Sequence, residues 1–86
     1  MNRIEFDNGA FSVDAALIAE GLGLQTEAVQ SRMREGKITS LCERGIDKDA
    51  GRYRLTFFHE RRRLRIVIDE SGQVIDQAVD RVRGRR

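Results

Sequence analysis

The sequence predicts a single α+β domain of two layers, in which a pair of helices packs on one face of an antiparallel meander sheet. Three observations lead to this fold class. Apolar side chains recur at helical spacing in residues 14–36, they alternate with polar ones in residues 53–68, and the connections between the later strands are short. Because short connections join antiparallel neighbours, we expect the element order β-α-α-β-β-β-β.

Length and composition agree with one small cytoplasmic domain. The chain has 86 residues, no proline and a single cysteine, Cys42, so no internal disulfide can stabilise the fold. We expect residues 1–80 to form the domain and residues 81–86 to be a basic, frayed tail. No segment is apolar enough to span a membrane, and a second copy of the chain could supply further stability as a homodimer.

The first half predicts a strand followed by two helices. Residues 3–7 alternate as a strand does, Asn8-Gly9 is a strong turn signal, and Phe11 and Val13 extend that edge. Asp14 is placed to cap a helix over residues 15–20, which Gly21 and Gly23 then end. Thr26 is expected to cap the second helix, which buries Val29 and stops at Gly36.

The second half predicts four strands, over residues 38–46, 53–58, 64–68 and 73–76. Residues 47–51, 60–62 and 70–72 connect them. The alternation places Tyr53, Leu55 and Phe57 on one face of the sheet, matched by Leu64, Ile66 and Ile68 of the next strand. In the first of these strands, Cys42 shares a face with Ile38 and Ile46, and Leu41 points the other way.

The helix pair resembles a helix-turn-helix. Ala19, Gly23 and Val29 are placed as that motif requires, with a small residue at the helix crossing and glycine in the turn. On this interpretation Gln25, Thr26, Gln30 and Arg34 face DNA. The alternative is an ordinary helical hairpin, favoured by the acids Glu20, Glu27 and Glu35, whose negative charge would repel phosphate.

The arginines of the second half form the other candidate site. Residues 1–43 carry seven acids and four bases, whereas residues 44–86 carry seven acids and twelve bases, so the net charge of +2 conceals halves of −3 and +5. Arginine binds phosphate and carboxylate through two donors at once, which predicts an anion, RNA or protein surface. The alternative is a solvated sheet face whose charges discourage aggregation. The candidate residues are Arg52, Arg54, Arg61, Arg62, Arg63 and Arg65, with Arg81, Arg83, Arg85 and Arg86 in the tail.

No constellation of residues indicates catalysis, a metal or a cofactor. His59 is the only histidine and is expected at the surface beside a hairpin, whereas Cys42 is expected to be buried as a small apolar residue. A nucleophilic Cys42–His59 pair on neighbouring strands is conceivable, but no third group supports it. Phosphate-binding glycine loops and nucleophile elbows are absent.

Three runs of sequence, at residues 11–24, 33–45 and 49–58, together resemble a family of small proteobacterial proteins known only as a domain of unknown function. The resemblance extends from Ile4 to about Val74. It implies a stand-alone bacterial cytosolic domain and supplies no activity, cofactor or catalytic residue.

Three functions follow as hypotheses. The first is a non-catalytic binding or regulatory module that engages a protein or an anionic partner through the arginines of the sheet. The second is a nucleic-acid-binding protein that uses the helix pair or the basic strands and tail. The third is a small enzyme.

Overall fold

The structure, a computed structural model, describes residues 4–7, 10–45, 48 and 50–81. It confirms the predicted α+β class and adds one short strand, so that the chain begins with a hairpin. The elements are β1 Ile4–Asp7, β2 Ala10–Val13, α1 Ala15–Leu22, α2 Thr26–Arg34, β3 Ile38–Arg44, β4 Arg52–His59, β5 Arg62–Asp69 and β6 Val74–Arg81.

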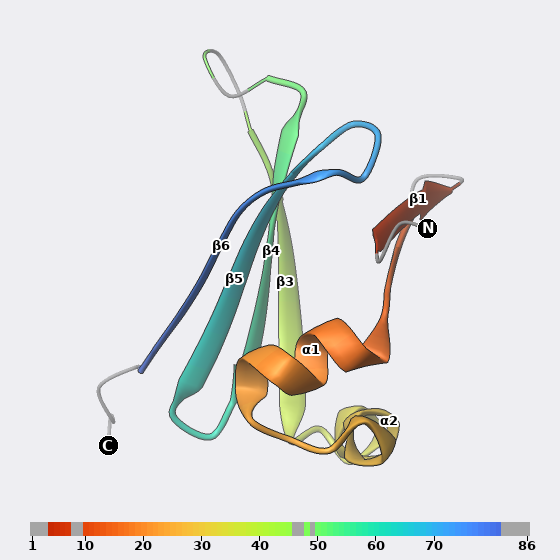
Figure 1. Cartoon of the computed structure of the whole chain (residues 1–86), viewed down its shortest axis with the longest axis vertical. Helices are drawn as coiled ribbons and strands as arrows, with labels where there is room; N and C mark the ends of the chain where they lie inside the picture. Colours follow the sequence, from red (N-terminus) through yellow and green to blue (C-terminus); the bar gives the residue numbers. More distant parts are fainter. Residues whose placement is uncertain (1–3, 8–9, 46–47, 49, 82–86) are drawn as a thin grey trace.

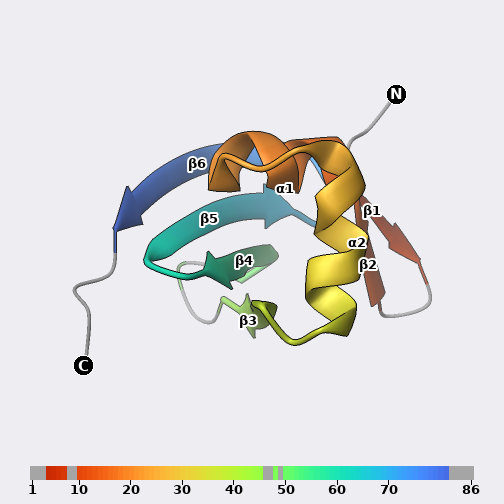
Figure 2. The same cartoon turned by 90° about the horizontal axis from the view of Figure 1, so that it is seen from below.

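Strands β3 to β6 form an antiparallel meander in the order β3-β4-β5-β6 (Figure 1). Both helices and the separate β1–β2 hairpin lie on one side of this sheet, with α2 beside β3 and α1 over β4 and β5 (Figure 2). We call this the helix side and the other the open side. No element of the described chain covers the open side. None of the described helices is long and apolar enough to cross a membrane.

The register confirms the predicted faces of the sheet. Leu55 lies opposite Ile66, and Phe57 lies opposite Leu64. Directly opposite residues point to the same side of an antiparallel sheet, so these pairs stack under the helices. The core is formed by Ile4, Leu17, Ile18, Ala19, Leu22, Val29, Ile38, Leu55, Phe57, Leu64, Ile66 and Ile68.

Strand β6 is longer than predicted and carries a β-bulge. Val67 of β5 lies opposite Asp76, whereas Ile68 lies opposite Val74, so Ile75 is an extra residue in β6. Beyond the bulge the strand continues to Arg81, the first residue of the predicted tail. The bulge therefore shifts the pairing of every residue from Asp76 to Arg81 by one position.

The helix ends differ from the prediction at two residues. Asp14 caps α1 as expected, because its Oδ1 accepts a hydrogen bond from the Ala16 N–H at 3.0 Å. The helix does not end at Gly21, which lies within it, and stops instead at Gly23, whose φ is +71°. Thr26 does not cap α2: it is the first residue of the helix, after Gln25, and no side chain caps that end.

The N-terminal hairpin packs against the far end of the sheet. Ile4 of β1 is completely buried, and the ring of Phe11 meets that of Tyr53 edge to face with 5.0 Å between centroids. Gly72, in the turn between β5 and β6, lies directly against the backbone of Ile4. These contacts hold the hairpin to the domain.

Candidate anion-binding site

The structure divides the predicted arginine set between the two sides of the sheet. The open side carries Arg54 and Arg65, and Arg65 lies opposite Thr56 in the register, as predicted. By the same alternation Arg52 and Arg63 also lie on the open side. Arg62 lies on the helix side, and Arg61 lies in the two-residue turn between β4 and β5.

Three of the four arginines that lie on the open side, all except Arg52, have acidic partners among the described residues. Arg54 Nη2 is 2.7 Å from Glu43 Oε1. Arg63 donates two hydrogen bonds to Asp80, from Nε to Oδ1 at 2.9 Å and from Nη2 to Oδ2 at 2.7 Å. Arg65 Nη2 is 3.5 Å from the same Oδ2. Much of the positive charge on this side is therefore already compensated within the protein.

The Arg63–Asp80 pair also shifts the titration of both groups. The hydrogen bond from Arg63 lowers the pKa of the Asp80 carboxyl below its ordinary value, and the same bond raises the pKa of Arg63. In the turn after β5, the hydroxyl of Ser71 donates to Asp69 Oδ1 at 2.7 Å and lowers the pKa of that carboxyl. Both carboxylates therefore favour the folded state in their ionised form.

We expect Asp80 to make stability depend on acidity. Because its pKa is lower in the folded state, its contribution is complete above the unfolded value of about 3.9 and is lost as the pH falls through the lowered folded value. Urea unfolding over that pH range should show a weaker pH dependence for Asp80→Asn than for the unchanged protein. Asp76→Asn, on the same strand and without an ion pair to a described residue, is the control. An unchanged pH dependence in Asp80→Asn would contradict this.

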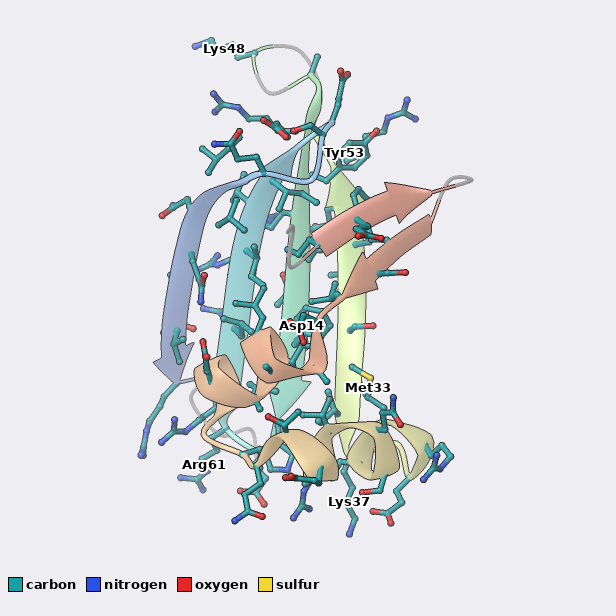
Figure 3. All side chains as sticks on the ribbon, turned by 45° about the vertical axis from the view of Figure 1, so that its right-hand side comes forward. Asp14, Met33, Lys37, Lys48, Tyr53 and Arg61 are labelled. Atoms are coloured by element: carbon teal, nitrogen blue, oxygen red, sulfur yellow. The ribbon has the colours of Figure 1, made fainter. Side chains whose placement is uncertain are left out.

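A second group of basic residues lies at the β4–β5 turn. His59 lies opposite Arg62, and Arg62 lies opposite Arg81, so three basic side chains form one row across β4, β5 and β6. Arg61 follows in the adjoining turn, at the end of the sheet away from Lys48 (Figure 3). We call His59, Arg61, Arg62 and Arg81 the basic end.

The positive charge of the basic end is not neutralised by ion pairs in the described part of the chain. None of its three arginines forms an ion pair with a described residue. Like charges directly opposite in a sheet destabilise it, which applies to Arg62 and Arg81. A bound anion would relieve that repulsion. Arg83, Arg85 and Arg86 follow Arg81 in the sequence but lie outside the described residues.

The basic end surrounds a cavity of about 370 Å³ beside the end of α1. The turn after α1 forms one wall, and the β4–β5 turn and the end of β6 form the other. Arg62 lies so close to Gly23 that a Cβ there would be 2.9 Å from Arg62 Nη1. This position also places a cation at the negative end of the helix dipole. The cavity is lined by Leu22, Gly23, Leu24, His59, Glu60, Arg61, Arg62 and Arg81.

His59 is buried, and the expectation that it lies at the surface is wrong. Only 7% of it is exposed, because the turn after α1 covers this end of the sheet. Its imidazole ring forms no hydrogen bond with the residues that the structure describes. Among the described residues, the only fully buried side-chain nitrogen or oxygen that lacks a hydrogen-bond partner is Arg32 Nε. The ring nitrogens of His59 are therefore not fully buried and keep access to solvent. The cavity supplies that access.

Cys42 is exposed, so its expected burial is also wrong. It does lie on the helix side, opposite Leu55. However, β3 is an edge strand, and Cys42 lines an apolar groove of about 470 Å³ between this strand, β2 and α2. His59 lies opposite Ile38, four residues from Cys42 along β3, which corresponds to about 13 Å. The two side chains are therefore not brought together as a catalytic pair. Ile46, its other expected neighbour, lies outside the described residues.

The four residues proposed to face DNA are all exposed. Gln25 and Thr26 lie at the start of α2, and Gln30 and Arg34 lie further along it. In Figure 1 α2 is seen end-on while α1 lies across the view, so the two helices cross steeply, as in a helix-turn-helix. Glu20, Glu27 and Glu35 are exposed on the same helices.

The sequence did not identify His59 as a residue of the candidate site, and it placed Arg81 in the predicted tail. The pairing of His59 with Arg62 could have been found, because a two-residue turn at Glu60-Arg61 places them opposite each other. The pairing of Arg62 with Arg81 depends on the bulge at Ile75, for which the sequence has no signal. No group of three potential metal ligands occurs within the described ranges.

Comparison with protein families gives a match over the whole chain. The family described as "Family of unknown function (DUF6522)" matches residues 1–86. No curated protein and no solved structure matches the chain.

Proposed function

We propose that this chain, which belongs to the DUF6522 family of unknown function, is a non-catalytic module that binds an anionic partner at its basic end. One observation carries the proposal. Arg62 and Arg81 lie directly opposite each other and have no acidic partner in the described chain, at a cavity that Arg61 and the buried His59 also line. A bacterial cytoplasm is the setting that we propose for it.

The basic end is favoured over the open side, where the arginines were first expected to act. On the open side Glu43 and Asp80 bind three of the four arginines, so an incoming anion would have to displace a carboxylate to reach any of those three. At the basic end an anion gains guanidinium contacts without breaking an ion pair in the described protein. The free energy of binding should therefore come mainly from Arg61, Arg62 and Arg81.

Binding of charged polymers at increasing salt tests this proposal. We expect a labelled mixed-sequence single-stranded DNA, a poly-glutamate peptide, or both to bind at low salt. Three neutralised phosphates would give a slope of log K against log salt of roughly −2, and Arg61→Ala with Arg81→Ala should reduce its magnitude by about 1.4. Arg52→Ala with Arg54→Ala, on the open side, is the matched control and should leave the slope unchanged.

The same experiment separates the possible partners. Binding of DNA alone favours a nucleic-acid partner, and binding of poly-glutamate as well favours recognition of anionic protein segments. If neither polymer binds at low salt, or if the open-side variant loses as much affinity as the basic-end variant, the proposal is wrong.

A second candidate function is DNA binding by the helix pair. The observation that favours it is the exposure of Gln25, Thr26, Gln30 and Arg34 on a steeply crossing second helix. In the same assay with duplex DNA, Gln30→Ala with Arg34→Ala would then abolish binding, whereas Arg61→Ala with Arg81→Ala would leave it.

A further inference from the structure

We infer that the cavity at the basic end is a binding site for the dianionic phosphate group of a phosphate monoester. This inference rests on the proposed function and names the ligand class of the same site. It depends on the charge, the donors and the size of the cavity.

The charge of the cavity matches that of a phosphate monoester. Its lining contains three guanidiniums and one carboxylate, that of Glu60, so the ionised groups give +2 before His59 is counted. A phosphate monoester carries about −1.5 to −2 at neutral pH. A carboxylate or a phosphodiester carries only one negative charge and would leave positive charge uncompensated.

The donors suit a tetrahedral oxyanion with several acceptor oxygens. Arg62 and Arg81 approach from adjacent strands on one side of the sheet, and Arg61 approaches from the turn. Each guanidinium can donate two parallel hydrogen bonds to a phosphate. His59 adds a ring N–H, which a histidine possesses whether it is neutral or protonated. Because His59 is 7% exposed and its ring has no hydrogen-bond partner among the described residues, a ligand oxygen would accept a hydrogen bond that the fold leaves unmade.

The size of the cavity indicates more than a bare anion. Its volume of about 370 Å³ lies at the lower end of the range of about 300–1,000 Å³ for small-molecule sites. A phosphate group fills only part of it. Its lining also includes the apolar side chains of Leu22 and Leu24. The site can therefore hold the phosphate together with the first atoms of the group esterified to it.

Glu60 is the acidic residue in the lining of the cavity, so a variant of Glu60 tests how binding depends on the charge of the site. Glu60 lies in the β4–β5 turn, where its φ of +56° is a backbone conformation that favours glycine. It also lines the cavity. Its negative charge should weaken the binding of a dianion. Glu60→Gln removes that charge with little change in size, and we expect it to tighten binding by about two- to fivefold.

The test compares methyl phosphate, dimethyl phosphate and acetate as ligands. His59 is the only histidine, so its ring protons give one unambiguous NMR signal pair within the proposed site. We expect methyl phosphate to shift these signals saturably, and dimethyl phosphate and acetate to bind at least about tenfold more weakly because charge-assisted hydrogen bonds are lost. Arg81→Lys keeps the positive charge but removes the two parallel N–H donors of the guanidinium, so it should also weaken methyl phosphate binding severalfold.

Controls and alternative outcomes keep this inference separate from the proposed function. Arg52→Ala on the open side should leave the titration unchanged. Arg62→Ala should weaken methyl phosphate binding, and Arg61→Ala tests the same loss of a guanidinium if Arg62→Ala disturbs the end of α1. If a polymer binds at the basic end while methyl phosphate leaves His59 unshifted, the inference fails and the proposed function stands. Equal affinity for all three small anions would also overturn the inference, because it would indicate a general cationic cluster. If neither polymer nor phosphate binds, both are wrong.

Discussion

A Leu64→Ala variant is expected to lose about 2–5 kcal/mol of its free energy of unfolding. Leu64 is completely buried in β5, between Phe57 of β4 and helix α1. A domain of this size has a thin core and a stability of only several kcal/mol, so such a loss would leave a substantial unfolded population at room temperature. Urea unfolding followed by circular dichroism measures the effect.

The control for Leu64→Ala is Leu41→Ala, which removes the same atoms from the open side. Leu41 is 50% exposed, so we expect a loss below about 1 kcal/mol. A comparable loss in both variants would mean that the helix side is not the core.

The position of Leu64 explains why Gly21 lies inside α1. A Cβ on Gly21 would be 2.6 Å from Leu64 Cδ1 and 2.9 Å from its Cγ, so the helix can approach β5 only because residue 21 has no side chain. Gly21→Ala should therefore destabilise the protein despite the better helix propensity of alanine. It should cost less in a Leu64→Ala background, where the space is free, and this coupling is measurable as a double-mutant cycle.

Gly72→Ala is expected to cost about 2–4 kcal/mol, since it combines backbone strain with a steric clash. The φ of Gly72 is +89°, which a residue with a Cβ rarely adopts, and a Cβ there would be 2.6 Å from the carbonyl oxygen of Ile4. Because that atom belongs to the backbone of β1, the hairpin must move away. Hydrogen exchange should show faster exchange of the β1 and β2 amides, together with a lower midpoint of urea unfolding.

Gly36→Ala separates the two causes. Gly36 has a similar φ of +76°, but a Cβ there would meet nothing within 4 Å. We expect it to cost about 1 kcal/mol, from strain alone. If Gly72→Ala costs no more than Gly36→Ala, the contact between the turn and β1 does not contribute to stability.

The sequence was sufficient for features that depend on local periodicity. The alternation from Tyr53 to Ile68 predicts which side chains share a face, and the register confirms it. Asp14 and Gly23 mark the two ends of α1 correctly, because caps depend on neighbouring residues and backbone conformation.

The features that the sequence could not supply depend on contacts between distant segments. Cys42 has the correct face but the wrong burial, since it lies on an edge strand and lines an open groove between that strand, β2 and α2. His59 is buried by the end of a helix that lies more than thirty residues away in the chain. Gly21 looks like a helix terminator until Leu64 is placed beside it.

The extra residue Ile75 determines which charges meet at the end of the sheet. If Ile75 paired regularly with Val67 and formed no bulge, the register of Ile68 and Val74 would continue along the strands, and Arg62 would lie opposite Asp80 instead of Arg81. The same side chains would then form a closed ion pair, and Arg63 would lose its acidic partner. Whether Arg62 meets a second arginine or an aspartate is thus decided by the register of one strand and not by the amino-acid composition, so a relative with the same residues but no bulge in β6 would close this ion pair.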